Sequence, residues 1–224
     1  ICLTQIVHEG TPVVCGGFTS NVDMKSGAPA FGTPENTRAN MAGGQLARRY
    51  NLPYRTSACS TSNAVDAQAV WETQMALWGA VSGHGNLIYH AAGWGEGGLV
   101  ASYEKLVVDC EMLQAISSLL NSVTFTNDDL GLSAQENVLP GGHFFGSEHT
   151  ISRYRDAFYT PFLSDWTNHE AWEAAGSQKA EDRATSVWQK MLEGFHPPNL
   201  PQDRIEALED YVYRRKEEIG TNEL

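Results

Sequence analysis

Basic residues are scarce in this sequence. Lysine and arginine number 15 against 27 aspartates and glutamates, which gives the 224 residues a formal net charge of −12. Nucleic-acid binding needs a basic patch that neutralises phosphates, and so small a set of cations argues against one. The sequence therefore predicts no nucleic-acid partner.

Paired metal ligands are also missing. The four cysteines are widely spaced with no C-x-x-C pair, and the seven histidines form neither an H-x-x-H nor an H-E-x-x-H pattern. Such spacings are what zinc sites and disulfide frameworks require. We expect no metal site and free cysteines, which fits a reducing cytoplasm best. Cys59 ends an apolar segment and is expected to be an inert buried thiol rather than a nucleophile.

Long apolar runs are absent as well, and the sequence predicts no N-terminal leader. No stretch approaches the roughly 20 apolar residues of a membrane span, and the chain opens without a charged-then-apolar segment. It starts at Ile1 rather than methionine, and residues 1–10 read as the end of a helix that enters a strand. We expect a cytoplasmic protein with no membrane contact, of which this chain is a fragment.

What is present is a repeated strand-then-helix pattern. Short apolar segments with polar or glycine-rich residues after them predict four strands, at 11–18, 52–58, 85–93 and 140–146. Helical spacing predicts the intervening and following helices, at 34–50, 63–83, 102–120, a short one at 128–138, and two more at 178–193 and 202–218. Thr33, Pro34 and Glu35 supply an N-cap, a first-turn proline and a first-turn acid for the first of these.

Four such units imply a parallel sheet buried on both faces, with ligands at the carboxyl ends of its strands. They make half of an eight-unit barrel. We therefore expect residues 1–150 to be the C-terminal half of a (β/α)8 TIM barrel. Residues 151–224 are expected to form an aromatic-rich wrap and C-terminal helices packed on it. The apolar stripe of the last helix is expected to dock on its own domain, with a homo-oligomer interface as second choice.

Four long segments carry a resemblance to a known family. They are "SACSTSNAVDAQAVWETQMALWGA", "NLIYHAAGWGEGGLVASYEKLVVDCEML", "PGGHFFGSEHT" and "DAFYTPFLSDWTNHEAWEAAG", in that order. Together they resemble the C-terminal half of the trimethylamine methyltransferase family, whose relatives also act on glycine betaine and other quaternary amines. The resemblance implies a βα-barrel enzyme that moves a methyl group from an amine nitrogen to the cobalt of a corrinoid. A separate partner protein carries that corrinoid, and no cofactor is bound tightly by this chain.

One departure from the family pattern bears on the substrate. The archaeal trimethylamine enzymes carry pyrrolysine, whereas every residue here is standard. This favours a quaternary amine such as glycine betaine, whose nitrogen already bears the positive charge that makes it a leaving group. Displacement at a methyl carbon needs little acid–base work, which agrees with the lack of a general-base constellation. A non-catalytic binding protein for a betaine-like cation on the same scaffold stays open.

Aromatic residues at the predicted strand ends suit a quaternary ammonium ion, which has no hydrogen-bond donor and is held by ring faces. Alternatively, Phe144 and Phe145 fill the barrel interior and Trp94 packs under a helix. The candidate substrate-binding residues are Phe18, Asn21, Trp94, His143, Phe144 and Phe145.

His90, Glu148 and His149 are the candidate catalytic residues. His90 would orient a substrate carboxylate or lie close to the cobalt; alternatively it is a hydrogen-bonded core histidine. Glu148 and His149 form part of a cluster of titratable groups, but Ser147 or Thr150 could equally cap a helix there.

Small residues mark the predicted approach of the corrinoid: Ser60, Gly93, Gly97 and Gly98, where the backbone leaves room for a flat cofactor. On the following helix, Asp66 is expected to favour the helix dipole, and Glu72 to occupy a solvated or salt-bridged position.

Overall fold

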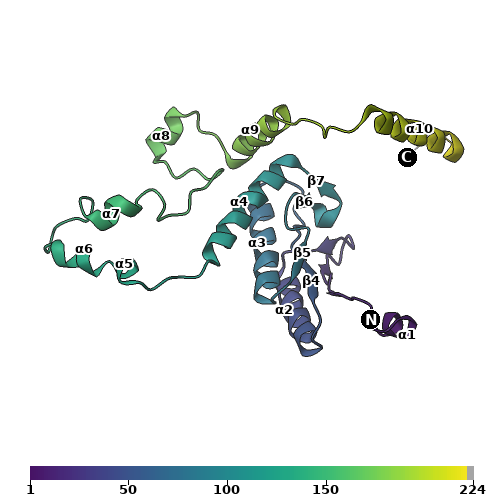
Figure 1. The fold of residues 1–224 in the computed structure, drawn as a ribbon, viewed down its shortest axis with the longest axis horizontal. Helices are drawn as coiled ribbons and strands as arrows, with labels where there is room; N and C mark the ends of the chain where they lie inside the picture. Colours follow the sequence, from purple (N-terminus) through teal and green to yellow (C-terminus); the bar gives the residue numbers. More distant parts are fainter. Residues whose placement is uncertain (221–224) are drawn as a thin grey trace. The chain divides into compact units, whose positions relative to one another are not determined.

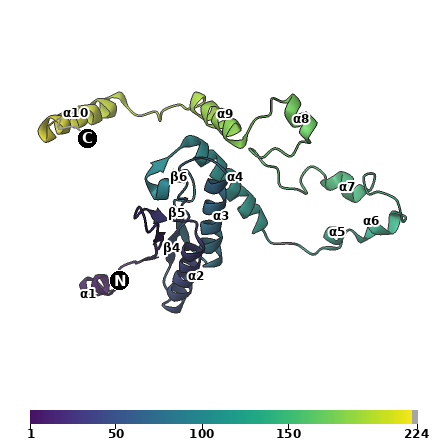
Figure 2. The same ribbon diagram turned by 180° about the vertical axis from the view of Figure 1, so that it is seen from behind.

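The computed structural model describes residues 1–220 and is a mixed α/β structure with parallel strands (Figures 1 and 2). It divides into two compact units, one spanning Ile1–Trp188 and one that begins at Gln189. In the part of the chain that the structure describes, no helix combines the length and the apolarity needed to cross a membrane.

A parallel sheet lies at the centre of the first unit. Its strands are β1 (Cys15–Gly16), β4 (Tyr54–Ser57) and β5 (Leu87–Tyr89), in the order β1-β4-β5. Arg55 is in register with Gly16 on one side and with Leu87 on the other. Since successive strand residues point to opposite faces, Gly16, Arg55 and Leu87 share one face of the sheet.

Three helices follow these strands along the chain: α2 (Pro34–Arg49), α3 (Ala67–Ser82) and α4 (Tyr103–Leu119). Each begins at a polar N-cap whose side chain accepts a backbone N–H three residues on, supplied by Thr33, Asp66 and Ser102. Figures 1 and 2 show α3 beside the strands and α4 next to α3. The predicted helices at 34–50 and 102–120 are confirmed, and that at 63–83 begins later because Asp66 caps it.

The helices cover one face of the sheet. Ala58, Ala76, Leu77 and Ile116 form a buried cluster there, with Ile88 of β5 packed against it. On the opposite face Leu87 and Tyr89 keep 46% and 47% of their surface exposed. Within residues 1–220 the sheet is therefore buried on one face, not on both as the sequence predicts.

Two small hairpins form the loops at the carboxyl ends of the parallel strands. After β1 come β2 (Asn21–Val22) and β3 (Pro29–Ala30), which pair antiparallel. After β5 come β6 (Trp94–Gly95), the 3-10 turn η1 (Glu96–Gly98) and β7 (Val100–Ala101), with β6 and β7 also antiparallel. Asn21, Trp94, Gly97 and Gly98 therefore lie on short, hydrogen-bonded hairpins.

The remaining elements within residues 1–220 are five short helices, at most six residues each, and the two longer helices α9 and α10. They are α1 (Cys2–Val7), α5 (Asn127–Leu130), α6 (Leu132–Asn137), α7 (Glu148–Arg153), α8 (His169–Ala174), α9 (Ala180–Glu193) and α10 (Gln202–Ile219). The α10 helix lies in the second unit. The predicted helices at 178–193 and 202–218 are confirmed. The predicted helix at 128–138 is two short helices, because Gly131 adopts a left-handed conformation between them.

The aromatic-rich segment after residue 150 contacts α4 through one carboxylate. Glu111 accepts the backbone N–H groups of Phe162 and Leu163, each at 2.9 Å, and the hydroxyls of Tyr159 and Ser164 at 3.1 and 3.2 Å. Leu163 is buried with Val107 and Val108 of α4 in a second apolar cluster. This segment is thus anchored on α4 by both hydrogen bonds and apolar packing.

The fourth predicted strand, at 140–146, is wrong. Those residues form turns, in which the N–H of Gly142 bonds Leu139 at 2.9 Å. Pro140 has no N–H to give to a ladder, and Gly141 takes a positive φ of 81° that a strand cannot contain. The first predicted strand, at 11–18, shortens to two residues, and Pro12 likewise cannot donate to a ladder.

Replacement of Gly44 by alanine tests the close contact between α2 and the end of α3. A Cβ at Gly44 would lie 1.8 Å from the carbonyl oxygen of Gly83. We expect Gly44→Ala to lower the free energy of unfolding by about 1–3 kcal/mol or more, because the two helices must separate. Urea denaturation followed by circular dichroism measures this.

Gly146→Ala is the matched control. A Cβ there has no atom within 4 Å and its φ is not positive, so stability should stay the same or rise by about 0.4–1 kcal/mol. Equal losses in the two variants would contradict the packing argument.

Candidate functional site

Aromatic rings from three segments meet at the carboxyl end of the sheet. The His90 ring lies 5.3 Å from the Phe18 ring and 5.4 Å, edge-on, from the Trp94 ring, and Phe18 lies 4.7 Å from Phe31. We call Phe18, Phe31, His90 and Trp94 the aromatic cluster. The structure thus brings together three residues that the sequence singled out separately.

His90 has an uncommon backbone conformation. Its φ of 57° is in the left-handed region, which costs a non-glycine residue about 1–3 kcal/mol and concentrates at functional sites. Its Nδ1 lies 2.7 Å from the hydroxyl oxygen of the buried Ser57 at the end of β4. That bond fixes the ring, and it leaves Nε2 without a hydrogen-bond partner among residues 1–220.

The surroundings of the His90 ring favour its neutral form. Partial burial, and then the positive charge of Arg55, lower the pKa of His90 from its ordinary value of 6.5. An uncharged imidazole does not repel a cation bound beside it. The aromatic cluster can therefore receive a positively charged ligand at neutral pH without competition from this ring.

Arg55 lies on the uncovered face of the sheet. Its guanidinium carbon is 4.2 Å from the centre of the Tyr89 ring. Its Nε is buried, and in the described part of the chain no atom accepts a hydrogen bond from it. Sequence reasoning did not select this residue, although an arginine inside a strand of otherwise uncharged residues is a signal that could have found it.

The loop after β4 is held by a single carboxylate of α3. Glu72 Oε2 accepts the Ser60 hydroxyl at 3.0 Å and the backbone N–H groups of Thr61 and Ser62 at 2.8 and 3.0 Å. Ser60 is fully buried, so its side chain serves this network. Glu72 is therefore a positioning residue, where the sequence predicts a solvated or salt-bridged one.

A buried ion pair holds the backbone between His90 and Trp94. Asp109 Oδ2 accepts the Gly93 N–H at 2.9 Å, and both oxygens contact the Lys105 ammonium, which also bonds Thr73 at 2.8 Å. Lys105 and Asp109 are 3% and 1% exposed. Burial raises the pKa of Asp109 despite the neighbouring cation. Both residues lie one turn apart on α4, and sequence reasoning missed them.

Internal packing accounts for two of the nearby glycines. A Cβ at Gly95 would lie 2.9 Å from the Ser62 carbonyl oxygen, and one at Gly97 would lie 3.1 Å from Pro29. At Gly98 the nearest atom would be the Cys59 sulfur at 4.0 Å, so this glycine is not required by such a contact. Burial raises the pKa of Cys59 to about 11, as expected for an inert thiol.

The other predicted site residues make local contacts. Asn21 accepts a hydrogen bond at 2.6 Å from Thr33, the cap of α2. His149 bonds the backbone oxygen of Asp128 at 2.8 Å, and the His143 ring lies 5.3 Å from Phe145. Glu148 is exposed in the first turn of α7, which Ser147 caps as predicted, and Phe144 and Phe145 are exposed. Within residues 1–220 no hydrogen bond and no ring pair joins these residues to the aromatic cluster.

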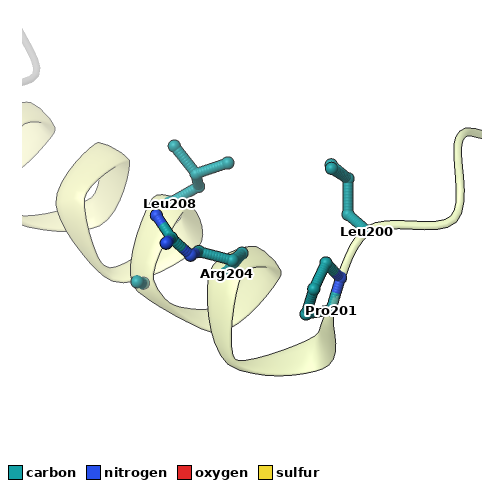
Figure 3. A pocket seen from close by; sticks show the side chains of 5 residues that line it. Leu200, Pro201, Arg204 and Leu208 are labelled. Carbon is teal, nitrogen blue, oxygen red and sulfur yellow. The ribbon is translucent and has the colours of Figure 1, made fainter.

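A separate hollow lies in the second unit, at the start of α10. Figure 3 shows Leu200, Pro201, Arg204 and Leu208 around it, and Ala207 completes its lining. Its lining carries one charged group and no nucleophile. It offers no chemistry comparable with that of the aromatic cluster.

Comparison with known proteins gives a consistent set of relatives. The family model described as trimethylamine methyltransferase (MTTB) matches residues 1–220. The chain is 34% identical to glycine betaine methyltransferase of Desulfitobacterium hafniense (strain Y51), over 98% of this chain and 46% of that protein. It is 30% identical to a trimethylamine methyltransferase of Desulfitobacterium hafniense (strain DSM 10664 / DCB-2), over 98% of this chain and 44% of that protein.

A third relative is named for a different amine. Proline betaine:corrinoid methyltransferase of Eubacterium limosum is 27% identical over 95% of this chain and 44% of its own length. The chain thus spans a little under half the length of the curated relatives that it matches here.

Removal of Asp109 tests the buried ion pair. Asp109→Ala leaves the Lys105 ammonium buried and uncompensated, so we expect the free energy of unfolding to fall by about 3–5 kcal/mol in urea denaturation. Asp128→Ala is the control, because the Asp128 side chain, which pairs with Arg153, is 71% exposed. The loss of this exposed pair should lower the free energy of unfolding by less than about 1 kcal/mol. A loss as small as that of the control would contradict the assigned role.

The lowered pKa of His90 predicts a pH dependence of stability. The folded state binds this proton less readily than the unfolded chain does. The contribution of His90 to the free energy of unfolding should therefore be fully present above pH 6.5 and be lost as the pH falls below that value. Denaturation from about pH 7.5 to about pH 5 measures the slope. His90→Gln should remove this part of it, whereas replacement of the exposed His196 by glutamine should retain it. An unchanged slope in His90→Gln would refute the assignment.

Proposed function

The chain belongs to the trimethylamine methyltransferase family, and from this premise we propose that the protein transfers a methyl group from a quaternary or tertiary amine of the glycine betaine kind. The acceptor is the cobalt of a corrinoid held by a partner protein. The names of three relatives support an amine or betaine as methyl donor, and one of those names includes a corrinoid.

The aromatic cluster is the observation that carries this proposal. Ring faces attract a quaternary ammonium ion by its charge and need no hydrogen bond from it. Phe18, His90 and Trp94 come together at the carboxyl end of a parallel sheet, where α/β enzymes bind their ligands. Phe18 is 49% exposed, which leaves ring surface for a ligand.

In this proposal the residues of the chain position the methyl donor and do not transfer protons. The C–N bond breaks with its electron pair on nitrogen, so the amine leaves neutral and needs no general acid. The Ser57 hydroxyl holds the His90 ring at Nδ1, and Asp109 of the α4 ion pair holds the backbone N–H of Gly93, next to Trp94. The rings of His90 and Trp94 are therefore fixed before the substrate binds. Such preorganisation is how positioning lowers a barrier.

The corrinoid supplies the metal centre that accepts the methyl group. Of the residues proposed to meet it, Gly98 fits the approach of a flat ring, because no atom lies closer than 4.0 Å to the place of a Cβ. Ser60 is buried by its own loop, Gly97 is needed by packing, and a Cβ at Gly93 would already lie 3.4 Å from Leu106. We therefore assign Gly98 as the point of closest backbone approach.

The proposal extends to the architecture. The βα units within residues 1–150 would form the C-terminal part of a (β/α)8 TIM barrel, whose interior is lined by the face that carries Arg55, Leu87 and Tyr89. Residues 151–188 would wrap it. The anchoring of Leu163 on α4 supports the wrap.

Methyl transfer is tested directly with the full-length protein, reduced free cobalamin and glycine betaine. We expect the absorption spectrum to convert to that of methylated cobalamin, with dimethylglycine formed in equal amount. If calorimetry shows that glycine betaine binds but the cobalamin spectrum does not change, the proposed catalysis is wrong and the protein only binds the betaine. Trimethylamine and proline betaine, tested in parallel, define the preferred amine.

Replacement of Trp94 tests the aromatic cluster as a cation site. Trp94→Leu removes an aromatic face, so tetramethylammonium binding should weaken about 2- to 30-fold in titration calorimetry. Trp166→Leu is the control, since Trp166 is 68% exposed and lies outside the cluster. Equal affinities in Trp94→Leu and the wild type would exclude Trp94 from the site.

A further inference from the structure

Arg55 is a charged group whose role the proposed function does not use. It projects from the middle of β4, on the face of the sheet shared with Gly16 and Leu87. Its Nε is buried, and within residues 1–220 neither a hydrogen bond nor an ion pair engages its guanidinium. A buried donor without a partner costs free energy, and the described residues supply no anion to the guanidinium.

The guanidinium is held in place by stacking. Its carbon lies 4.2 Å from the centre of the Tyr89 ring, and the Tyr89 ring lies 5.9 Å from the His90 ring. The neighbour on the other strand, Gly16, has no side chain, and even a Cβ there would meet only the Arg55 side chain at 3.8 Å. Arg55 is therefore fixed beside the aromatic cluster with room next to it.

This placement has an electrostatic consequence. A guanidinium next to the aromatic cluster repels a simple cation, and the described contacts of the cluster include no carboxylate to offset it. A zwitterion removes the conflict, because its carboxylate can meet the guanidinium while its ammonium group meets the rings. Arginine is also the side chain best suited to bind a carboxylate with two parallel hydrogen bonds.

We propose that Arg55 binds the carboxylate of the methyl donor and thereby selects betaines over amines that lack a carboxylate. This inference rests on the proposed function, since it names the substrate class of the same site. Tyr89 orients the guanidinium, and the aromatic cluster receives the methylated nitrogen. Arg55 is thus a specificity-determining residue.

Binding of two ligands to three variants tests the inference by titration calorimetry. The ligands are glycine betaine and tetramethylammonium, which share the methylated nitrogen but differ in the carboxylate. Arg55→Gln should weaken glycine betaine binding about 10- to 100-fold, the loss expected for hydrogen bonds between charged groups. Tetramethylammonium binding should stay the same or strengthen. Arg55→Lys keeps the charge without the two-pronged geometry and should give an intermediate loss for glycine betaine.

Arg38→Gln is the matched control, because it removes the same charge from an exposed position on α2; both affinities should match the wild type. Equal weakening of both ligands in Arg55→Gln would show a structural role and overturn the inference, as would unchanged binding of glycine betaine. If the wild-type protein binds neither ligand, the proposed function itself fails.

Discussion

Carboxylates on helices hold the backbone of the loops that follow the strands. Glu72 of α3 accepts the N–H groups of Thr61 and Ser62, and Asp109 of α4 accepts that of Gly93. N–H groups at a strand end have lost their ladder partners, and a fixed anionic acceptor satisfies them with strong hydrogen bonds. The positions of His90 and Trp94 depend on these contacts, since both residues flank the backbone that Asp109 holds.

Buried charge thus has two different uses in this chain. Lys105 and Asp109 neutralise each other, and their removal as a pair would cost less than the loss of either alone. Arg55 has no such partner in the described residues and stacks on Tyr89 instead. A charge with an internal partner positions the loop, whereas a charge without one is available to a ligand of opposite sign.

Local signals were sufficient for several predictions. The helices at 34–49 and 103–119 follow from N-caps and spacing within a few residues, and Phe18, His90 and Trp94 were found because each comes soon after an apolar strand. The strand at 140–146 failed because a strand exists only through a partner, which composition does not supply. Arg55 was missed because its proposed role depends on its register with Gly16 and its stacking on Tyr89, which are contacts between strands.

The amino-acid sequence by itself determined the family, the order of the three parallel strands and the long helices, and the kinds of side chain at the ends of those strands, because these depend on contiguous motifs. Only the tertiary structure decided which side chains meet. The bond between Ser57 and His90 joins residues 33 positions apart, and the Lys105 contact with Thr73 spans 32. Such contacts arise from the packing of whole helices on the sheet, and no local pattern encodes them.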